Sequence, residues 1–216
     1  MIVLLVLLAT LHLMLVTVGA VTPLINIAYE WMESGEEGTR YQLNNRLTRF
    51  SIMAWVAGGI FGLLLGLASW SNELSGALGR LSSKVNYGII EYFFSLVLMV
   101  AYLVWRQRVA KPGAIHRSLR CLFPLAAGTN SIYHFPVLFA VAGELQRRGL
   151  WTGDGISASE FRQEWLVQSL VWAKSIHVVM AGLAFTGMTL LMISARAKRQ
   201  NDEPLFRMAA LAGARL

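Results

Sequence analysis

Residues 2–29, IVLLVLLATLHLMLVTVGAVTPLINIAY, form a stretch without a single Asp, Glu, Lys or Arg. A helix needs about 20 mostly apolar residues to cross the hydrocarbon core of a bilayer. The stretch therefore predicts a membrane-spanning helix that carries His12 inside it. A cleaved signal peptide is the alternative, because residues 18–20 (VGA) resemble a weak cleavage site. Signal peptides begin with positive charge, however, and no basic residue precedes Arg40, so we expect the helix to be retained.

Four further stretches of the 216-residue chain have the same character. Hydrophobic residues make up 56% of the sequence and charged residues 14%, against about 25% charged in soluble domains. A soluble fold would have to bury five long apolar helices in one small protein. We therefore predict an all-α integral membrane protein. Residues 1–203 form an up-and-down bundle of five transmembrane helices, and residues 204–216 form a short cytoplasmic or interfacial tail. The helices are expected at about 2–29, 50–70, 86–105, 120–143 and 165–194.

The basic residues predict which way the helices face. Cytoplasmic loops of membrane proteins are enriched in Lys and Arg. With the N-terminus outside, the segments 30–49, 106–120 and the C-terminal tail face the cytoplasm and hold 13 of the 19 basic residues. We therefore expect an external N-terminus and a cytoplasmic C-terminus, in a multi-pass protein of a bacterial or archaeal cytoplasmic membrane. The net charge of +7 then needs no nucleic-acid partner.

Three of the four histidines fall inside the expected spans, whereas His116 falls in the basic segment 106–120. A polar ring inside a membrane is costly and by default marks a functional site. At 1.5 Å per residue, His12 and His134 lie roughly 15 Å and His177 roughly 18 Å from the outer ends of their helices. One interpretation is that each ring bonds a neighbouring polar group and joins two helices, as Asn130 could do for His134.

A shared haem explains three imidazoles at one depth better. Imidazole ligates haem iron, and helix bundles hold haem between facing helices. A zinc site would add Cys or carboxylate ligands, and the outer half of the spans offers only Glu91. The glycines of the second span leave room for a flat macrocycle or for a neighbouring backbone. Basic residues on the outer side could pair with haem propionates or be ordinary loop charges: Arg147, Arg148, Arg162 and Lys174.

Five segments together resemble the N-terminal half of subunit I of cytochrome bd quinol oxidases. They follow one another in the family's order: LLATLHLMLVTVGAVTPL (7–24), RLTRFSIMAWVAGGIFGLLLG (46–66), EYFFSLVLMVAYLVWRQR (91–108), LAAGTNSIYHFPVLFAVAG (125–143) and KSIHVVMAGLAFTGM (174–188). The resemblance implies that His12 is a ligand at a high-spin haem site. It also implies that His177 is an axial ligand of the low-spin haem b that accepts electrons from quinol. Lys174 matches the lysine before that ligand, and Asn130 matches an asparagine of the fourth helix.

The sequence also departs from the family. The family continues beyond the fifth helix with a Met ligand and with the loop linked to quinol oxidation. The Glu of its FFLES-type motif is replaced, since residues 93–96 read FFSL. His134 has no counterpart in the family. An additional imidazole could replace the missing ligand, so we expect a bis-histidine haem b that uses His134 with either His12 or His177.

These observations predict a membrane b-type cytochrome subunit that transfers electrons between the quinone pool and a redox partner. One or two haems b are expected, quinone is a further candidate ligand, and no catalytic residue is assigned. The expected partners are other respiratory-complex subunits, among them an outer-side c-type cytochrome. Two alternatives remain open: a subunit of a terminal quinol oxidase completed by partner chains, and a haem-free structural or assembly subunit. A transporter is less favoured because the sequence shows no internal repeat.

Overall fold

The computed structural model describes residues 2–32, 38–109 and 113–216. Within these ranges all regular secondary structure is helical and no strand is present. Five helices are long and apolar enough to cross a membrane: α1 (Ile2–Met32), α2 (Thr39–Ala68), α4 (Ser82–Arg108), α5 (Ala114–Arg147) and α7 (Ser169–Arg199). The prediction of an all-helical chain with five candidate spans is therefore confirmed.

Short helices complete the described part of the chain: α3 (Asn72–Arg80), α6 (Ala158–Glu160), the π-helix η1 (Phe161–Trp165) and α8 (Glu203–Arg215). Local sequence signals mark where two of them begin. The hydroxyl of Ser71 accepts a hydrogen bond from the Leu74 amide, and the carboxylate of Asp202 accepts one from the Leu205 amide. Such caps satisfy amide groups that the first helical turn leaves without a partner. Most ends of the long helices extend past the expected apolar stretches, most of all the start of α2 at Thr39. The fifth span was expected from residue 165, but η1 occupies Phe161–Trp165 and α7 begins only at Ser169.

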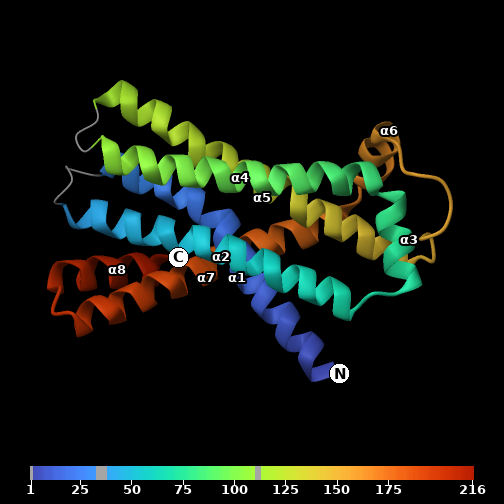
Figure 1. Ribbon diagram of the computed structural model, residues 1–216, viewed down its shortest axis with the longest axis horizontal. Coiled ribbons are helices and arrows are strands. Elements are labelled where there is room, and N and C mark those ends of the chain that lie inside the picture. The colour runs from blue at the N-terminus through green and yellow to red at the C-terminus, as the bar shows by residue number, and fades with distance from the viewer. Residues whose placement is uncertain (1, 33–37, 110–112) are drawn as a thin grey trace.

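The long helices lie side by side in one bundle (Figure 1). Helices α3 and α6 lie at one end, and α7 turns into α8 at the other. Because the long helices alternate in direction, α1 and α7 run the same way. The first turns of α1 project away from the other helices, and their side chains, such as Val3, are exposed (Figure 1).

Helix α8 is a packed part of the bundle. It runs back along α7, and its residues Leu205 and Ala209 are buried with Leu47 of α2 and with Leu190 of α7. The two backbones approach closely, since a Cβ atom on Gly213 would lie 2.7 Å from the carbonyl oxygen of Gly187. The segment expected as a short tail therefore packs on two of the spanning helices.

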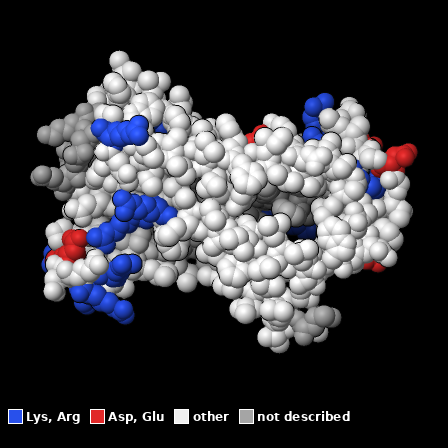
Figure 2. All heavy atoms as spheres, viewed as in Figure 1, with Lys and Arg blue, Asp and Glu red and all other residues white. Residues whose placement is uncertain are grey.

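The surface matches contact with lipid. Figure 2 shows a broad uncharged band across the middle of the molecule, with Lys and Arg gathered toward the end that carries the turn between α7 and α8. Large apolar side chains such as Leu63, Val97 and Met192 are exposed on the long helices. Exposed apolar surface of this extent marks an interaction site, and five adjacent apolar helices make lipid the natural partner.

A buried ion cluster joins three helices at one end of the bundle. Glu30 near the end of α1 is fully buried, as are Arg106 of α4 and Arg120 of α5, with side-chain exposures of 0%, 0% and 1%. Each arginine forms an ion pair with one carboxylate oxygen of Glu30, and Arg120 Nε lies 2.7 Å from Oε1. The hydroxyl of Tyr102 donates to Oε2 at 3.0 Å. This set is called the Glu30 cluster below.

Arg106 and Arg120, at the two ends of the expected cytoplasmic segment 106–120, both lie inside helices. Helix α4 continues to Arg108 and α5 begins at Ala114, so both arginines are helical and face the interior. Hydropathy counts charges as the ends of spans and carries no information about which charges meet in space. Lys111, which belongs to the same expected loop, lies outside the described residues.

The Glu30 cluster predicts a large loss of stability in the variant Glu30→Gln. Removing one partner of a buried ion pair leaves the other charge without its counterion, which costs about 3–5 kcal/mol. Unfolding of the detergent-purified protein, followed by circular dichroism, should show this loss.

The matched control is Arg207→Gln on α8. Arg207 pairs with Glu203 on the surface, where the two side chains are 74% and 56% exposed. Surface pairs contribute little, so this variant should unfold like the original protein. Equal stability of the two variants would show that the Glu30 cluster does not hold the helices together.

Candidate functional site

The His12 ring lies between α1 and α2 and has a defined orientation. Its Nδ1 atom lies 2.8 Å from the carbonyl oxygen of Gly58. A carbonyl oxygen can only accept, which assigns the proton to Nδ1 and leaves the lone pair on Nε2. Histidines that ligate metals usually donate their second ring nitrogen to a carbonyl or carboxylate in this way. The His12 imidazole is therefore arranged as a ligand through Nε2.

The glycines of α2 create the space for this ring. A Cβ atom on Gly62 would lie 2.6 Å from Cε1 of His12, which is closer than atoms can approach. A Cβ atom on Gly59 would meet the Tyr92 hydroxyl at 2.3 Å. Gly66, one turn beyond Gly62, has open space around it. The small residues of the second span thus make room for the His12 ring and for the Tyr92 hydroxyl, and they let α1 pack closely against α2.

His134 lies in a different environment, between two tyrosine rings. The ring centroids of Tyr87 and Tyr133 are 5.4 and 5.0 Å from that of His134. The imidazole also lines a cavity of about 160 Å³ between α4, α5 and η1. We call this the His134 cavity. Its other lining residues are Lys84, Tyr87, Gly88, Tyr133, Val137, Leu138, Phe161, Arg162 and Leu166.

Asn130, one turn before His134, ties α5 to α4. Its side-chain amide donates to the Glu91 carbonyl oxygen at 3.2 Å and to the Ser95 hydroxyl at 2.9 Å. Glu91 itself is buried. The contacts of Asn130 are therefore structural contacts between two helices.

Helix packing sets the relative heights of the histidines. The Thr22 and Thr186 hydroxyls are 3.3 Å apart, and Gly182 packs against the backbone of Thr17. His12 is five residues before Thr17, and His177 is five residues before Gly182. Because α1 and α7 run in parallel, the two histidines lie at the same height in the bundle.

His134 lies further toward the middle of α1. The neighbouring Phe135 packs against Trp55, whose ring contacts Gly19. Gly19 is seven residues after His12, which corresponds to roughly 10 Å along the helix. The structure therefore brings His12 and His177 to one height and places His134 elsewhere. Among the described residues, no three His, Cys, Asp or Glu side chains are arranged to hold a metal ion.

His177 is exposed on the outward face of α7. Its neighbours Ile176 and Met180 are exposed as well. A polar ring facing lipid at membrane depth is costly, so a cover for this face is expected.

Three of the four basic residues expected near haem propionates have another partner: Arg147, Arg148 and Lys174 pair with Glu144. Glu144 of α5 is fully buried and accepts from Lys174 at 2.9 Å and from Arg147 at 2.6 Å, with Arg148 at 3.4 Å. Only Arg162 of the expected group lines a cavity. Lys174 therefore connects α7 to α5.

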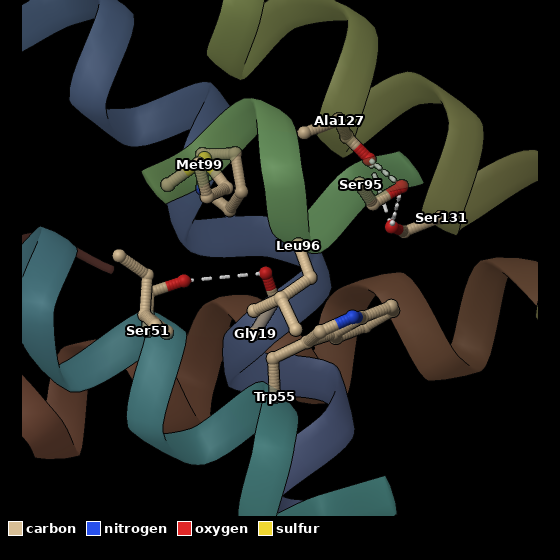
Figure 3. A pocket seen from close by; sticks show the side chains of 10 residues that line it. Gly19, Ser51, Trp55, Ser95, Leu96, Met99, Ala127 and Ser131 are labelled. Atoms are coloured by element: carbon tan, nitrogen blue, oxygen red, sulfur yellow. Dashed lines mark hydrogen bonds between the residues drawn. The ribbon is translucent and has the colours of Figure 1, made fainter. Parts of the chain in front are cut away.

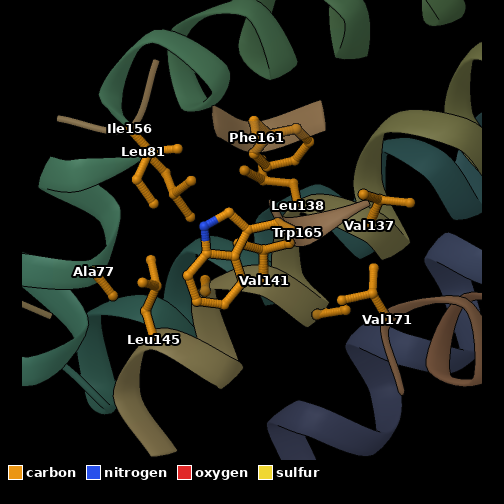
Figure 4. Packing of buried hydrophobic residues seen from close by; sticks show 12 residues of the cluster. Ala77, Leu81, Val137, Leu138, Val141, Leu145, Ile156, Phe161, Trp165 and Val171 are labelled. Atoms are coloured by element: carbon orange, nitrogen blue, oxygen red, sulfur yellow. The ribbon is translucent and has the colours of Figure 1, made fainter. Parts of the chain in front are cut away.

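An apolar cluster fixes the position of η1 against α5. Figure 4 shows Trp165 and Phe161 of η1 packed among Val137, Leu138 and Val141 of α5. Leu81 and Ala77 belong to the same cluster and bring α3 to this end of the bundle. The cluster forms one side of the His134 cavity.

Sequence reasoning missed two polar residues of this cavity. Lys84 lies just outside the third expected span, 86–105, yet it belongs to the first turn of α4. Tyr87 precedes Glu91 by one helical turn, so the two side chains share one face of α4. The four-residue spacing between Tyr87 and Glu91, which places both on one face of a helix, was the sequence signal that could have identified Tyr87.

A second, much smaller cavity lies where α1, α2, α4 and α5 meet (Figure 3). Its walls include Gly19, Ser51, Trp55, Ser95 and Ser131. The Ser51 hydroxyl donates to the Gly19 carbonyl oxygen at 3.3 Å, and the Ser131 hydroxyl donates to Ser95. Its volume of about 10 Å³ holds one water molecule at most, so this is a packing junction.

No family model, curated protein or solved structure matches the chain.

The orientation of His12 predicts a tautomer that can be measured. In protein labelled with ¹⁵N-histidine and prepared without haem, NMR should show the His12 proton on Nδ1, because Gly58 accepts from that atom. The exposed His116 provides a solvated reference in the same spectrum. A His12 proton on Nε2 would remove the argument that this ring is prepared to bind a metal.

Proposed function

We propose that the chain is a membrane b-type cytochrome subunit that transfers electrons between the quinone pool and a redox partner. The observation that carries the proposal is the hydrogen bond from His12 Nδ1 to the Gly58 carbonyl oxygen, which leaves the lone pair of the ring on Nε2. The resemblance to cytochrome bd subunit I supports the same role for this histidine.

The residues differ in how well they fit a haem. His12 has the required second hydrogen bond, and Gly62 of α2 leaves the room that its ring occupies. His177 fits a haem held at the outward face of α7, because such a group would cover the exposed ring. The His134 cavity is too small for a porphyrin, since about 160 Å³ accommodates a single six-membered ring.

His12 and His177 are therefore the ligand candidates of this proposal. The two rings face different surroundings, α2 for His12 and the exterior for His177, which favours two separate haems. The proposed haem sites therefore do not include the bis-histidine pair that was expected between His134 and His12 or His177. When bound, a haem b supplies the one-electron redox couple.

The chain's own contribution is to orient ligands and to exclude water. Gly58 fixes the rotation of the His12 ring through this hydrogen bond, as the hydrogen-bond partners of metal-ligating histidines do. The Trp55 and Tyr92 rings stack at a centroid distance of 5.1 Å and close the space between α2 and α4.

The charge distribution supports an orientation with the N-terminus outside and the C-terminus in the cytoplasm. Arg196, Lys198 and Arg199 end α7 beside α8, and the positive-inside rule assigns this end to the cytoplasm. The membrane would be the cytoplasmic membrane of a bacterium or an archaeon. The redox partner would then be an outer-side protein such as a c-type cytochrome.

A second candidate is a subunit of a terminal quinol oxidase that partner chains complete. The exposed position of His177 favours it, because a helix from another subunit would cover this face and could supply the other axial ligand. Oxygen uptake by a complex that contains this chain would distinguish an oxidase from an electron-transfer subunit.

The first test is a reduced-minus-oxidised absorption spectrum of the purified protein, with a pyridine haemochrome assay for stoichiometry. We expect a b-type signal, lost in part in His12→Ala and in part in His177→Ala. Colourless protein after expression with ample haem would overturn the proposal and favour a structural or assembly subunit.

A pair of glycine variants tests the His12 site without removing the ligand. In Gly62→Ala the new methyl group would displace the His12 ring, so haem content should fall or the absorption maximum should shift. Gly66→Ala is the matched control, since nothing lies within 4 Å of its Cβ position. Identical spectra for the two variants would exclude a haem on His12.

A further inference from the structure

The His134 cavity has the size of a ring. An engineered apolar cavity of about 150 Å³ in another protein binds benzene, so the 160 Å³ beside His134 accepts one six-membered ring. It lies between two candidate spans, α4 and α5, and is closed on one side by η1. A ligand in this place can extend an apolar tail into the surrounding lipid.

The walls of the cavity are aromatic and apolar. Tyr87, Tyr133 and Phe161 supply ring faces, and Val137 and Leu138 supply aliphatic surface. Figure 4 shows Val137, Leu138 and Phe161 on the side where η1 packs against α5. Such walls, with a few polar groups among them, are typical of small-molecule sites.

Hydrogen-bond donors reach the cavity from three elements. His134 comes from α5, Lys84 from α4 and Arg162 from η1. Within the described part of the chain, neither Lys84 nor Arg162 forms an ion pair, and the Lys84 ammonium instead lies 5.1 Å from the centre of the Phe161 ring. Both cations are therefore available to a ligand with acceptor oxygens.

Glu91 limits the charge that the ligand can carry. Glu91 is buried and lies one helical turn after Tyr87 on the same face of α4, and its backbone carbonyl oxygen accepts from Asn130, one turn before His134. A carboxylate behind the cavity repels an anion that enters deeply, whereas a neutral ring with acceptor oxygens meets the donors without this repulsion. The arrangement favours a neutral acceptor over an acidic head group.

We propose that the His134 cavity binds the head group of a membrane quinone. The ring lies among Tyr87, Tyr133 and Phe161, and its carbonyl oxygens accept from His134 and from Lys84 or Arg162. This inference rests on the proposed function, because that function supplies the quinone pool from which the ligand would come. It gives His134 a role separate from haem ligation.

Binding is tested on the full chain in nanodiscs of phosphatidylcholine, with decylubiquinone, whose head group is a single ring, as the probe in isothermal titration. His134→Leu and the double variant Lys84→Met with Arg162→Met should each weaken binding tenfold or more, because each removes the donors to one carbonyl oxygen. Leu166→Trp should abolish binding by filling the cavity while it keeps all the donors. His116→Leu and Arg207→Met, which change exposed residues far from the cavity, should bind like the original protein.

The haem spectrum separates this inference from the proposed function. The cavity variants should keep the b-type signal, since His12 and His177 contact other elements. Loss of haem in His134→Leu would make His134 a haem ligand and overturn the inference. Unchanged quinone binding in all three cavity variants would also overturn it, as would binding of phosphatidylglycerol in place of quinone. Quinone binding by haem-free protein would refute the proposed function and leave the quinone site standing.

Discussion

The Glu30 cluster is the constraint on which the arrangement of the helices depends. One carboxylate from α1 accepts from an arginine of α4 and an arginine of α5, so three helices meet at a single buried point. Burying ions is favourable only when the remaining donors are satisfied. Here Arg106 Nε donates to the Asn45 side chain at 3.0 Å, and Arg120 Nη1 donates to the Val109 carbonyl oxygen at 3.1 Å. These bonds bring α2 and the end of α4 into the same network.

The opposite end of the bundle is organised around a second buried carboxylate. Glu144 near the end of α5 accepts from Lys174 of α7, while Glu30 at the other end accepts from Arg120 near the start of α5. Helix α5 is thus tied to a different helix at each end. Between these ties, neutral hydrogen bonds such as that from Asn130 to Ser95 hold α5 on α4. The strong ionic contacts therefore sit toward the helix ends, and the centre relies on packing and small residues, as expected for helices that cross a lipid layer.

The sequence predicted the spanning helices well because charge-free length is a property of each segment alone. It could not predict the Glu30 cluster, since residues 30, 106 and 120 are distant in the chain and each marks the edge of an apolar stretch. The sequence correctly predicted that His12 and His177 lie at a similar height, because both depths were counted from the same side along parallel helices. His134 lies on an antiparallel helix, and its height depends on how Phe135 packs against Trp55, which no count along α5 can provide. The cavity residues Lys84 and Arg162 lie outside the expected spans, where they look like ordinary loop charges in the sequence. Only the packing of η1 against α5 brings them to one cavity.

Three identical side chains therefore have three different environments, and their chemistry follows from those environments. His12 donates to a backbone carbonyl in a space that glycine provides, which favours a metal ligand with a fixed tautomer. His134 faces a ring-sized cavity with cations at its edge and a carboxylate behind it, which favours hydrogen bonding to a neutral acceptor. His177 lies on an outward face, where only a further molecule could offset the cost of a polar ring in lipid. A common depth in the sequence thus does not establish a common site, because the groups packed around each ring decide what it can bind.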